Sequence, residues 1–464
     1  MNKYSHIFMI GIGGIGMSAL ARYFALNGQT VAGYDRTPSM ITSQLQDENI
    51  KVTFEDHLVF RDAAFSDPSK TLVIYTPAVK PDNPFMSWFH ERNFTMMKRS
   101  EVLGEISKKY KTIAVAGTHG KTSVSCMIAH LLRKSSTGCN AILGGIPKNY
   151  MTNFLHDENA DLLVTEADEF DKSFLKLHPY LAVITSADAD HLDIYGNRDS
   201  LIGSFNAFAG NIAVEGMLML KHHAGIQTMG LPVKNIFSYA LDDVNADVYA
   251  ENIKTGAKRM QFDLVTPGRK YEGLEMKPLG LINIENAVAA AFMAVYAGAS
   301  ENELREGLKT FDGVHRRLDR QFISREVIYI DDYAHHPEEI NALVKSVRAL
   351  YPGKKITGIF QPHLYSRTRD FADGFGESLS KLDEVVLLDI YPAREKPIVG
   401  VNSGIILQKI SHSNKQMLQK DELVDHLRNK TPEILLTIGA GDIDRLVLPI
   451  RKMLEESFKK EKTT

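Results

Sequence analysis

The sequence predicts an α/β protein of three domains, each built on an open, mainly parallel sheet. A chain of 464 residues is longer than a single hydrophobic core normally supports. Apolar runs typical of strands alternate with helical periodicity, the pattern of parallel α/β folds. Two glycine-rich turns, "GIGGIG" at 11–16 and "GTHGKTS" at 117–123, each stand between a strand and a helix. We expect a Rossmann-like domain at 1–104, a central domain of the P-loop ATPase type at 105–316, and a second Rossmann-like domain at 317–464.

The first segment opens with a strand at 6–12, the glycine turn and a helix that Asn27 and Gly28 should end. A second strand, "TVAGYD", ends at Asp35. Glycines at 11, 13 and 16, followed by an acidic residue after the next strand, form the GxGxxG pattern of a diphosphate site at a helix amino end. A diphosphate site of this kind can bind NAD, FAD or a UDP-sugar. "TLVIYTPAV" supplies another strand, which leads into a loop of small residues.

The central segment carries the second turn between the strand "KTIAVAG" and the helix "SVSCMIAHLLRK". Its glycines let the backbone approach an anion, Lys121 adds a point charge, and the Thr122 hydroxyl is suited to hold magnesium. Only two residues separate the first glycine from the Gly-Lys pair, where the usual P-loop has four. A chain with both turns more plausibly binds one nucleotide-linked substrate and one nucleoside triphosphate than a nicotinamide cofactor.

Acidic clusters follow two further central strands, "DLLVT" and "AVITS". Carboxyl ends of parallel strands meet at one sheet edge, and magnesium prefers oxygen ligands, so Glu166 is a candidate ligand. His191 is either a second ligand or structural. Short β-type runs between about 213 and 280 predict a small antiparallel element beside the parallel sheet. The helix that follows should end at Gly298.

The third segment begins with a strand, the loop "DDYAHHP" and a helix whose first residue is Pro337. The loop could hold a metal through Asp331, Asp332, His335 and His336. We favour a polar substrate pocket, because adjacent histidines on a loop seldom both face one ion. "FQPHLYSRTRD" sets His363, Arg367 and Arg369 at a strand end, where guanidinium groups suit a carboxylate.

Composition argues against several classes of partner. A formal net charge of −3 gives no general attraction to nucleic acid or to an anionic membrane. No window reaches 18 uninterrupted apolar residues, and the first residues lack the features of a secretory signal. Two cysteines are too few for a disulfide framework. We expect a cytoplasmic protein that is a monomer or a weak homodimer.

Eight motifs together resemble one family. In order, they are "GIGGIGMSALA", "GTHGKTS", "EADEFDKSF", "DADHLD", "NIENA", "GVHRRLD", "DDYAHHP" and "FQPHLYSRTRD". They resemble the Mur ligases of peptidoglycan synthesis over essentially the whole chain, and "GTHGKT" is similar to that family's own phosphate loop. The motifs are most similar to the branch that adds L-alanine. The resemblance implies ATP and Mg²⁺ (or Mn²⁺) as cofactors, and UDP-N-acetylmuramate and L-alanine as substrates joined through an acyl phosphate.

The resemblance also implies roles for individual residues. Lys121, His191, Arg317, His335 and Arg367 would be catalytic. Thr122 and Glu166 would bind one magnesium ion and His191 a second. ATP would contact the loop, the paired asparagines that hold the adenine, and an arginine at the domain junction: Gly117, Thr118, His119, Gly120, Lys121, Thr122, Ser123, Asn283, Asn286 and Arg317. The other substrates would contact Gly13, Gly14, Ile15, Gly16, Asp35, His57, Thr76, Pro77 and Ala78 in the first domain, and Asp332, Tyr333, His335 and Arg367 in the third.

Three departures bear on this assignment. No lysine follows "DHLD" before Lys221, as expected for the alanine-adding branch and unlike branches that carry a carbamylated lysine. Ile282 and Leu364 stand where the resemblance implies His and Arg in many alanine-adding relatives, so one adenine contact would differ and the amino-acid clamp would rest more heavily on Arg367. The alternatives are the ligase that attaches a whole tripeptide, a folylpolyglutamate synthase, which lacks the first domain, and a non-catalytic nucleotide-binding relative.

Overall fold

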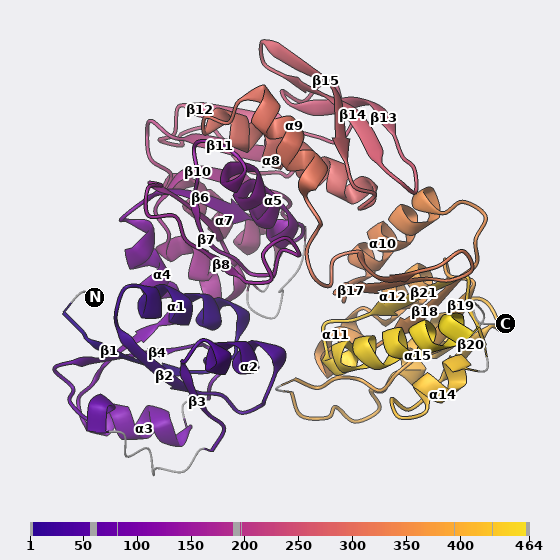
Figure 1. Cartoon of the computed structure of the whole chain (residues 1–464), viewed down its shortest axis with the longest axis horizontal. Helices are drawn as coiled ribbons and strands as arrows, with labels where there is room; N and C mark the ends of the chain where they lie inside the picture. The colour runs from indigo at the N-terminus through magenta and orange to yellow at the C-terminus, as the bar shows by residue number, and fades with distance from the viewer. Residues whose placement is uncertain are drawn as a thin grey trace. The chain divides into compact units, whose positions relative to one another are not determined.

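The chain forms two compact units in the computed structural model (Figure 1). The structure describes residues 3–55, 63–80, 82–188, 195, 197–393, 395–428 and 430–460. One unit comprises Met1–Glu251, Asp263–Leu274 and Glu285–Phe311, and the other comprises Asn252–Phe262, Glu275–Ile284 and Asp312–Thr464. The fold class is the predicted one, with parallel sheets in several domains. The boundaries at 104 and 316 stay predictions.

The predicted strand–turn–helix at the start of the chain belongs to a parallel sheet in the order β3-β2-β1-β4-β5. β1 is apolar and buried along most of its length, as expected for a strand covered on both faces. α1 ends where Asn27 and Gly28 predict, and Gly28 has a φ of +80°. The elements are β1 (His6–Ile10), α1 (Ile15–Leu26), β2 (Thr30–Tyr34), α2 (Met40–Asp47), β3 (Lys51–Thr53), η1 (Ala63–Phe65), β4 (Thr71–Tyr75), α3 (Pro84–Glu91), β5 (Thr95–Lys98) and α4 (Arg99–Ser107).

The central sheet has the order β12-β11-β10-β6-β9-β7-β8, and only the β7–β8 pair is antiparallel among its strand pairs. Its strands are β6 (Lys111–Ala116), β7 (Asn140–Ile142), β8 (Phe154–Leu155), β9 (Leu162–Glu166), β10 (Pro179–Ile184), β11 (Met217–Lys221) and β12 (Asn235–Tyr239). The helical segments α5 (Lys121–Arg133), η2 (Phe170–Lys176) and α7 (Arg198–Gly210) lie between them in the chain. Because β9 and β10 flank β6 in parallel, the loops after all three strands leave from one edge of the sheet.

The region between 213 and 280 divides differently from the prediction. β11 and β12 join the large sheet in parallel, and β11 is buried along most of its length. The separate small sheet contains only β13 (Tyr249–Lys254), β14 (Met260–Thr266) and β15 (Arg269–Met276). α8 (Leu281–Tyr296) follows, and Gly298, with a φ of +115°, lies two residues after its end, close to the predicted position. α9 (Glu301–Thr310) begins with a capping box made by Ser300 and Glu303.

The second unit contains a six-stranded sheet in the order β16-β17-β21-β18-β19-β20, in which only β16 is antiparallel to its neighbour. Pro337 is the first residue of α10, as predicted, and His336 caps that helix. The elements are β16 (Asp319–Ile323), β17 (Ile328–Asp332), α10 (Pro337–Leu350), β18 (Ile356–Phe360), α11 (Tyr365–Asp370), α12 (Ala372–Leu379), β19 (Glu384–Leu387), α13 (Gly404–Lys409), β20 (Lys415–Met417), α14 (Leu423–Arg428), β21 (Ile434–Ile438), η3 (Asp442–Leu446) and α15 (Val447–Lys460).

A buried asparagine ties the first sheet's helix α1 to the central segment. Asn153 is fully buried, and its side-chain amide donates to the carbonyl of Ile15 at 2.5 Å and to the Ser18 hydroxyl at 3.1 Å. Its side-chain oxygen accepts from Arg22 at 2.5 Å, and Arg22 also forms an ion pair with Glu48 at 2.8 Å. One hydrophobic cluster runs through both sheets of this unit. The first and central sheets therefore share one core.

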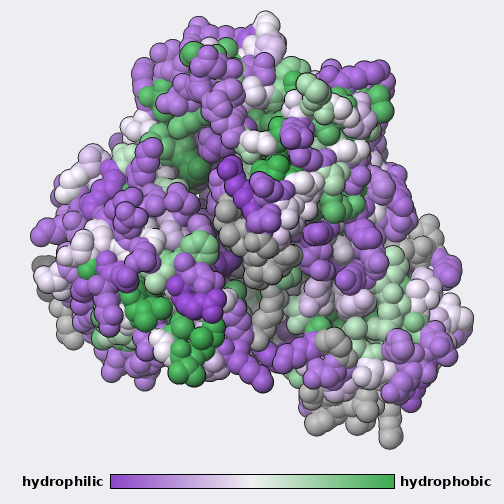
Figure 2. Space-filling view, turned by 180° about the vertical axis from the view of Figure 1, so that it is seen from behind, coloured by the Kyte–Doolittle hydropathy of each residue, from purple (hydrophilic) through white to green (hydrophobic). Residues whose placement is uncertain are grey.

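Hydrophilic residues predominate on the face shown in Figure 2, and hydrophobic residues occur between them in small groups. Over the residues that the structure describes, no helix has the length and apolar composition that a membrane span requires.

Candidate functional site

The loop between β6 and α5 is shaped by two glycines. Gly117 and Gly120 have φ values of +125° and +84°, a region that residues with a side chain rarely adopt. A Cβ atom on Gly117 would also lie 2.3 Å from the Thr185 hydroxyl. Ser186, after β10, holds the loop: its hydroxyl accepts from the His119 amide at 2.8 Å and lies 2.8 Å from the Thr118 hydroxyl. The short spacing in "GTHGKT" thus forms a tight, preorganised turn, and Ser186 is a residue that the sequence did not identify.

Lys121, the first residue of α5, has a side chain that is only 12% exposed and lies beside acidic groups. Its ammonium donates to the carbonyl of Gly117 at 2.6 Å and forms an ion pair with Glu169 at 2.7 Å. Burial lowers the pKa of Lys121, but attraction to Glu169, then Asp168 and Glu166, outweighs burial and raises the pKa above its ordinary value. Lys121 therefore stays charged at neutral pH, as a phosphate-binding lysine must.

Two predicted metal ligands meet at the same sheet edge. The Thr122 hydroxyl, from the first turn of α5, donates to Oε2 of Glu166, the last residue of β9, at 2.9 Å. Gly144 leaves room for that carboxylate, because a Cβ there would lie 2.0 Å from Oε2. A hydroxyl and a carboxylate oxygen beside a phosphate loop fit magnesium, which prefers oxygen ligands and retains waters. His191 lies outside the described residues, so the second metal position stays a prediction.

The two asparagines of α8 differ in what they contact. Asn286 lies beside the phosphate loop, since its side-chain oxygen is 3.2 Å from the position of a Cβ on Gly120. Asn283, on the same helix, donates its side-chain amide to the Leu279 carbonyl at 2.7 Å and so supports the start of α8. Of the two asparagines, Asn286 is the one that lies beside the predicted phosphate loop. Ile282, on the same helix, is 36% exposed.

In the first sheet, Asp35 is part of the glycine turn itself. One carboxylate oxygen accepts from the amide of Gly13 at 2.8 Å, and the other accepts from the amide of Thr37 at 3.2 Å. Gly14 precedes α1 as its N-cap, and Ile15 and Gly16 are the first residues of that helix. The amides of this turn point along a helix amino end, which suits an anion. Asp35 therefore positions the predicted diphosphate turn.

The loop of small residues after β4 lies against the same turn. The amide of Thr76 donates to the carbonyl of Ile10 at 3.4 Å, and a Cβ on Gly11 would come within 2.5 Å of the Thr76 methyl group. Pro77 and Ala78 follow Thr76 in this loop. The predicted contact residue His57 lies outside the described residues. The glycine turn and the "TPA" loop are thus neighbours, and their contact with a UDP-linked substrate stays a prediction.

Arg99 is a further charged residue at this edge that the sequence did not identify. Its guanidinium lies against the glycine turn, where a Cβ on Gly16 would be 2.9 Å from one of its nitrogens. The same side chain pairs with Asp168 at 3.5 Å. Asp168 directly precedes Glu169, the partner of Lys121. Arg99 therefore connects the first glycine turn with the acidic loop beside the second glycine turn. Its position directly after a strand is the feature of the sequence that could have identified it.

In the second unit, the carboxyl end of β17 carries the predicted third-domain residues. The carboxylate of Asp332 accepts from the amide of Leu318 at 2.6 Å and from the amide of Ala334 at 2.8 Å. Burial raises the pKa of Asp332 to about 6, although Arg317 and the two amides act in the opposite direction. The Arg317 guanidinium lies over the ring of Tyr333, 5.1 Å from its centroid. Asp332, Tyr333 and Arg317 are thus brought together.

His335 lies in the same group. Its Nδ1 is 2.9 Å from the carbonyl of Tyr333, and because a carbonyl can only accept, Nδ1 carries the proton in the neutral ring. Burial lowers the pKa of His335, and the positive charges of Arg367 and Arg317 lower it further against the opposing effect of Glu339. His335 is therefore a neutral imidazole at pH 7 with the lone pair on Nε2.

Some residues of the motif "FQPHLYSRTRD" lie near His335, and others do not. The charge of Arg367 acts on His335, and the ring centroid of His363 lies 6.0 Å from that of His335. Arg369 instead pairs with its neighbour Asp370 on the surface. Leu364, the N-cap of α11, has a φ of +68°, an unusual conformation for a residue with a side chain.

The alternative of a metal site in "DDYAHHP" gains no support. Asp331 accepts from Thr437 at 2.7 Å and pairs with Arg316 at 3.2 Å, and His336 serves as the cap of α10. Within the described ranges, the group of residues with metal-ligand spacing lies elsewhere, at His222, His223 and Asp243.

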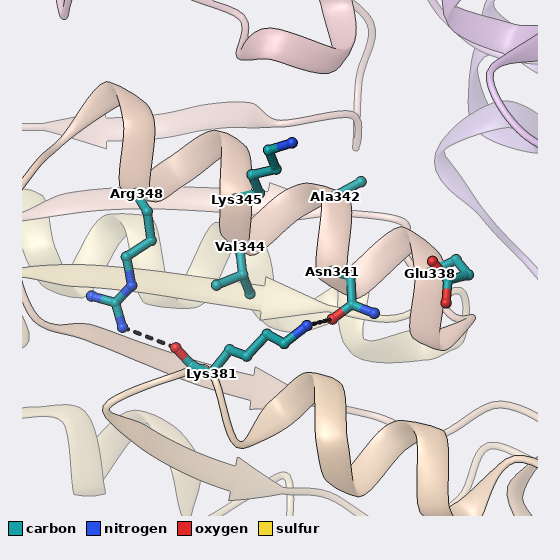
Figure 3. Close-up of a pocket in the computed structure, with 7 residues that line it drawn as sticks. All are labelled: Glu338, Asn341, Ala342, Val344, Lys345, Arg348 and Lys381. Carbon is teal, nitrogen blue, oxygen red and sulfur yellow. Dashed lines mark hydrogen bonds between the residues drawn. The ribbon is translucent and has the colours of Figure 1, made fainter.

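A hollow of about 520 Å³ lies on α10 and the nearby Lys381 (Figure 3). Lys381 donates to the side chain of Asn341 at 2.7 Å, and Arg348 donates to the carbonyl of Lys381 at 2.9 Å. Its lining contains none of the predicted site residues: Glu338, Asn341, Ala342, Val344, Lys345, Arg348 and Lys381.

Known proteins match the chain over nearly its full length. Family models match three consecutive parts: "Mur ligase family, catalytic domain" at residues 6–111, "Mur ligase middle domain" at 115–294 and "Mur ligase, glutamate ligase domain" at 316–441. A UDP-N-acetylmuramate--L-alanine ligase of Porphyromonas gingivalis (strain W83) is 49% identical over 97% of this chain and 99% of that protein. The protein of that name from Parabacteroides distasonis is 46% identical over 99% of each chain.

The crystal structure of UDP-N-acetylmuramate-alanine ligase MurC from Thermotoga maritima is similar with a TM-score of 0.82 and 26% identity, over 97% of this chain and 99% of that one. Since both the sequence matches and this structural match extend through all three domains, the chain belongs to the Mur ligase family.

Proposed function

We propose that the chain is an ATP-dependent ligase that joins L-alanine to the lactyl carboxylate of UDP-N-acetylmuramate. Full-length relatives at 49% and 46% identity carry that activity in their names. The observation that carries the chemistry is the preorganised phosphate loop, where Lys121 is charged and mostly shielded from solvent and the Thr122 and Glu166 oxygens lie 2.9 Å apart. We place the reaction in the cytoplasm, where ATP and UDP-linked precursors are available.

The reaction has two steps. First, a lactyl carboxylate oxygen attacks the γ-phosphorus of ATP, the bond to the bridging oxygen breaks, and ADP leaves with the electron pair. Second, the neutral amine of L-alanine attacks the carbonyl carbon of the acyl phosphate. The carbon–oxygen bond to phosphate breaks, the amine gives up one proton, and the amide forms. In such phosphoryl transfer the protein acts mainly through positioning and charge neutralisation.

The first unit supplies the phosphate and metal groups. Lys121 offsets charge on the β and γ phosphates, which the amides of the Gly117–Ser123 loop also approach. Thr122 and Glu166 would hold Mg²⁺, which when bound neutralises phosphate charge and orients the γ-phosphate. Asn286 lies beside Gly120 and is suited to the nucleotide. The turn at Gly13–Gly16 would receive the UDP diphosphate, with Arg99 as an added positive charge.

The second unit supplies a proton acceptor. We infer that Nε2 of His335 accepts the proton that the alanine amine releases, since its ring is neutral and Nδ1–H is already donated to Tyr333. Arg367 and Arg317 offer guanidinium groups for carboxylate and phosphate oxygens. Tyr333, stacked against Arg317, keeps that guanidinium in place.

An omission assay tests the proposal. Phosphate release should require UDP-N-acetylmuramate, Mg²⁺ and L-alanine together, and it should be lost in the Lys121→Ala variant. Mass spectrometry should show one amide-linked alanine on the product. A panel of L-alanine, glycine, L-serine and the tripeptide defines the acceptor. Preference for the tripeptide would replace this function with the recycling activity, and full turnover by Lys121→Ala would refute the role of the phosphate loop.

A further inference from the structure

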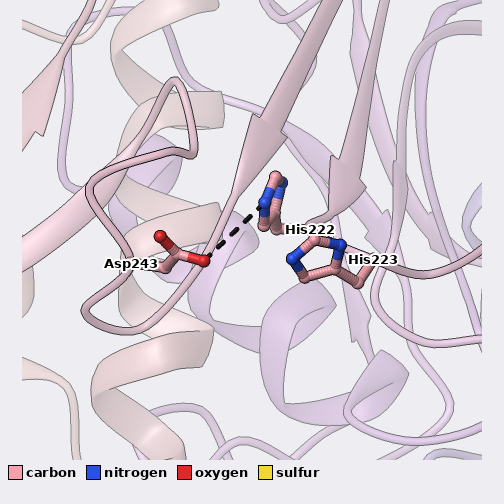
Figure 4. A group of neighbouring side chains, drawn as sticks. All are labelled: His222, His223 and Asp243. Atoms are coloured by element: carbon pink, nitrogen blue, oxygen red, sulfur yellow. Dashed lines mark ion pairs between the residues drawn. The ribbon is translucent and has the colours of Figure 1, made fainter.

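Two histidines and an aspartate form a cluster apart from the proposed ATP site (Figure 4). His222 and His223 follow β11, and Asp243 lies in the loop after β12. Each offers one ligand atom, and these atoms all lie within 4.8 Å of one another. Nε2 of His222 and Oδ2 of Asp243 are 3.7 Å apart. The side chains face one another in Figure 4, so their polar atoms converge on one point.

Sheet pairing brings the two loops together. β11 and β12 are parallel neighbours, and Lys221 pairs in register with Tyr239 at their carboxyl ends. The amide of His222 then donates to the carbonyl of Tyr239 at 2.7 Å, which fixes the start of the loop. His223 has a φ of +64°, which turns the chain back so that the two imidazole rings lie 3.8 Å apart between centroids. This backbone turn allows adjacent histidines to face one point.

The carboxylate of Asp243 is oriented by its own loop. Oδ1 accepts from the amide of Asn245 at 2.9 Å and from the Asn245 side chain at 2.8 Å, while Oδ2 faces His222. These hydrogen bonds hold the pKa of Asp243 below its ordinary value. Hydrogen-bonded support of this kind is what metal-ligating carboxylates typically have. The nearby Lys221 pairs with Glu285 at 2.9 Å, so its positive charge is neutralised.

We propose that His222, His223 and Asp243 bind one divalent first-row transition cation, with Zn²⁺ as the best fit. Two imidazole nitrogens and a carboxylate oxygen are a three-ligand set for zinc, with a fourth position for water. At zinc–ligand distances of about 2.0 to 2.1 Å, tetrahedral ligand atoms lie roughly 3.4 Å apart, so the 3.7 Å pair needs only a small contraction. Mg²⁺ prefers oxygen ligands and would not compete. The proposal is independent of the proposed ligase function.

Zinc titration of the metal-free full-length protein tests the site. Zn²⁺ is added against a chromophoric chelator in the presence of excess Mg²⁺, which competes for sites made of oxygen ligands. The wild-type protein should bind one equivalent that His222→Ala, His223→Ala and Asp243→Asn each weaken by at least about tenfold. The double variant His222→Ala/His223→Ala should lose it. His90→Ala, which removes an exposed histidine of α3, is the matched control and should keep it.

Cobalt gives a second readout that does not depend on folding differences. Co²⁺ bound by this set should show the strong visible absorption of a tetrahedral site, absent from the double variant. Circular dichroism and ligase turnover should be unchanged in all variants, since these residues lie outside the ATP site. Zinc binding that is equal in the wild type and the double variant, or absent from the wild type, would overturn the proposal.

Discussion

Replacement of Gly144 by alanine should damage the proposed metal site without unfolding the protein. A Cβ at this position would lie 2.0 Å from Oε2 and 2.6 Å from Cδ of Glu166. Ordinary van der Waals contact begins near 3.4 Å, so Oε2 must retreat by about 1.4 Å. That movement breaks its 2.9 Å hydrogen bond with Thr122. Because the end of a glutamate side chain is flexible, the substitution should change the geometry of the site more than the stability of the fold.

The expected size of the effect follows from this displacement. A misplacement of about 1 Å in a reacting constellation can cost about 100-fold in rate, which is roughly 2.7 kcal/mol in the barrier. The free energy of unfolding should change by less than about 1 kcal/mol, as for a substitution whose clash a side chain can relieve. The variant should therefore turn over about 100-fold more slowly and need more Mg²⁺ for half-maximal rate.

The assay is phosphate release against Mg²⁺ concentration with ATP, UDP-N-acetylmuramate and L-alanine saturating. Gly203→Ala is the matched control, because a Cβ on this exposed helical residue meets nothing within 4 Å. The double variant Gly144→Ala/Glu166→Asp shortens the carboxylate arm by one methylene and should recover part of the rate. A Gly144→Ala enzyme with wild-type turnover and wild-type Mg²⁺ dependence would refute the assignment of Glu166 to the metal.

Three further outcomes are expected. Glu169→Gln should lower the free energy of unfolding by about 3 kcal/mol in a urea titration, since it removes the buried carboxylate that pairs with Lys121. Asp168→Asn should cost less than about 1 kcal/mol in the same titration, because the pair of Asp168 with Arg99 is partly exposed. The pKa of Asp332 in the folded protein is raised to about 6, so the folded state loses stability as this carboxyl ionises. As the pH rises from about 4 to 6, the free energy of unfolding of the wild type should fall by up to about 3 kcal/mol relative to that of Asp332→Asn. Urea midpoints that change with pH in parallel for the two proteins would contradict this. His335→Gln should lower kcat by at least about 100-fold at pH 7 in steady-state kinetics, and a smaller loss would remove it as the proton acceptor.

Local signals predicted most of the fold. Apolar periodicity and glycine placement located β1, the glycine turn and α1, and a proline marked the start of α10. The strands between 213 and 280 were less clear, because a short apolar run does not say which sheet it will join. β11 and β12 extend the central parallel sheet through pairings that depend on tertiary contact.

The sequence predicted the parts of the candidate site that lie in motifs. It did not predict which residues form ion pairs with one another in the folded chain. Thr122 and Glu166 meet as expected, because both lie at the carboxyl edge of one parallel sheet. The partner of Lys121, however, is Glu169, which lies 48 residues away in the sequence among several acidic residues. Nothing local distinguishes Glu169 from its neighbours. Clearances such as that at Gly144 depend on atoms brought together only by folding.

The buried Asn153 has a consequence for the exchange of domains between relatives. Its amide is fully engaged by α1, although it lies well beyond the first glycine turn in the chain. A chimera that takes residues 1–104 from another family member replaces Ser18 and Arg22, so the donor must supply matching partners or leave the buried Asn153 side chain without them. For such an exchange the first sheet and position 153 act as one unit, because a single asparagine side chain joins α1 to the central segment.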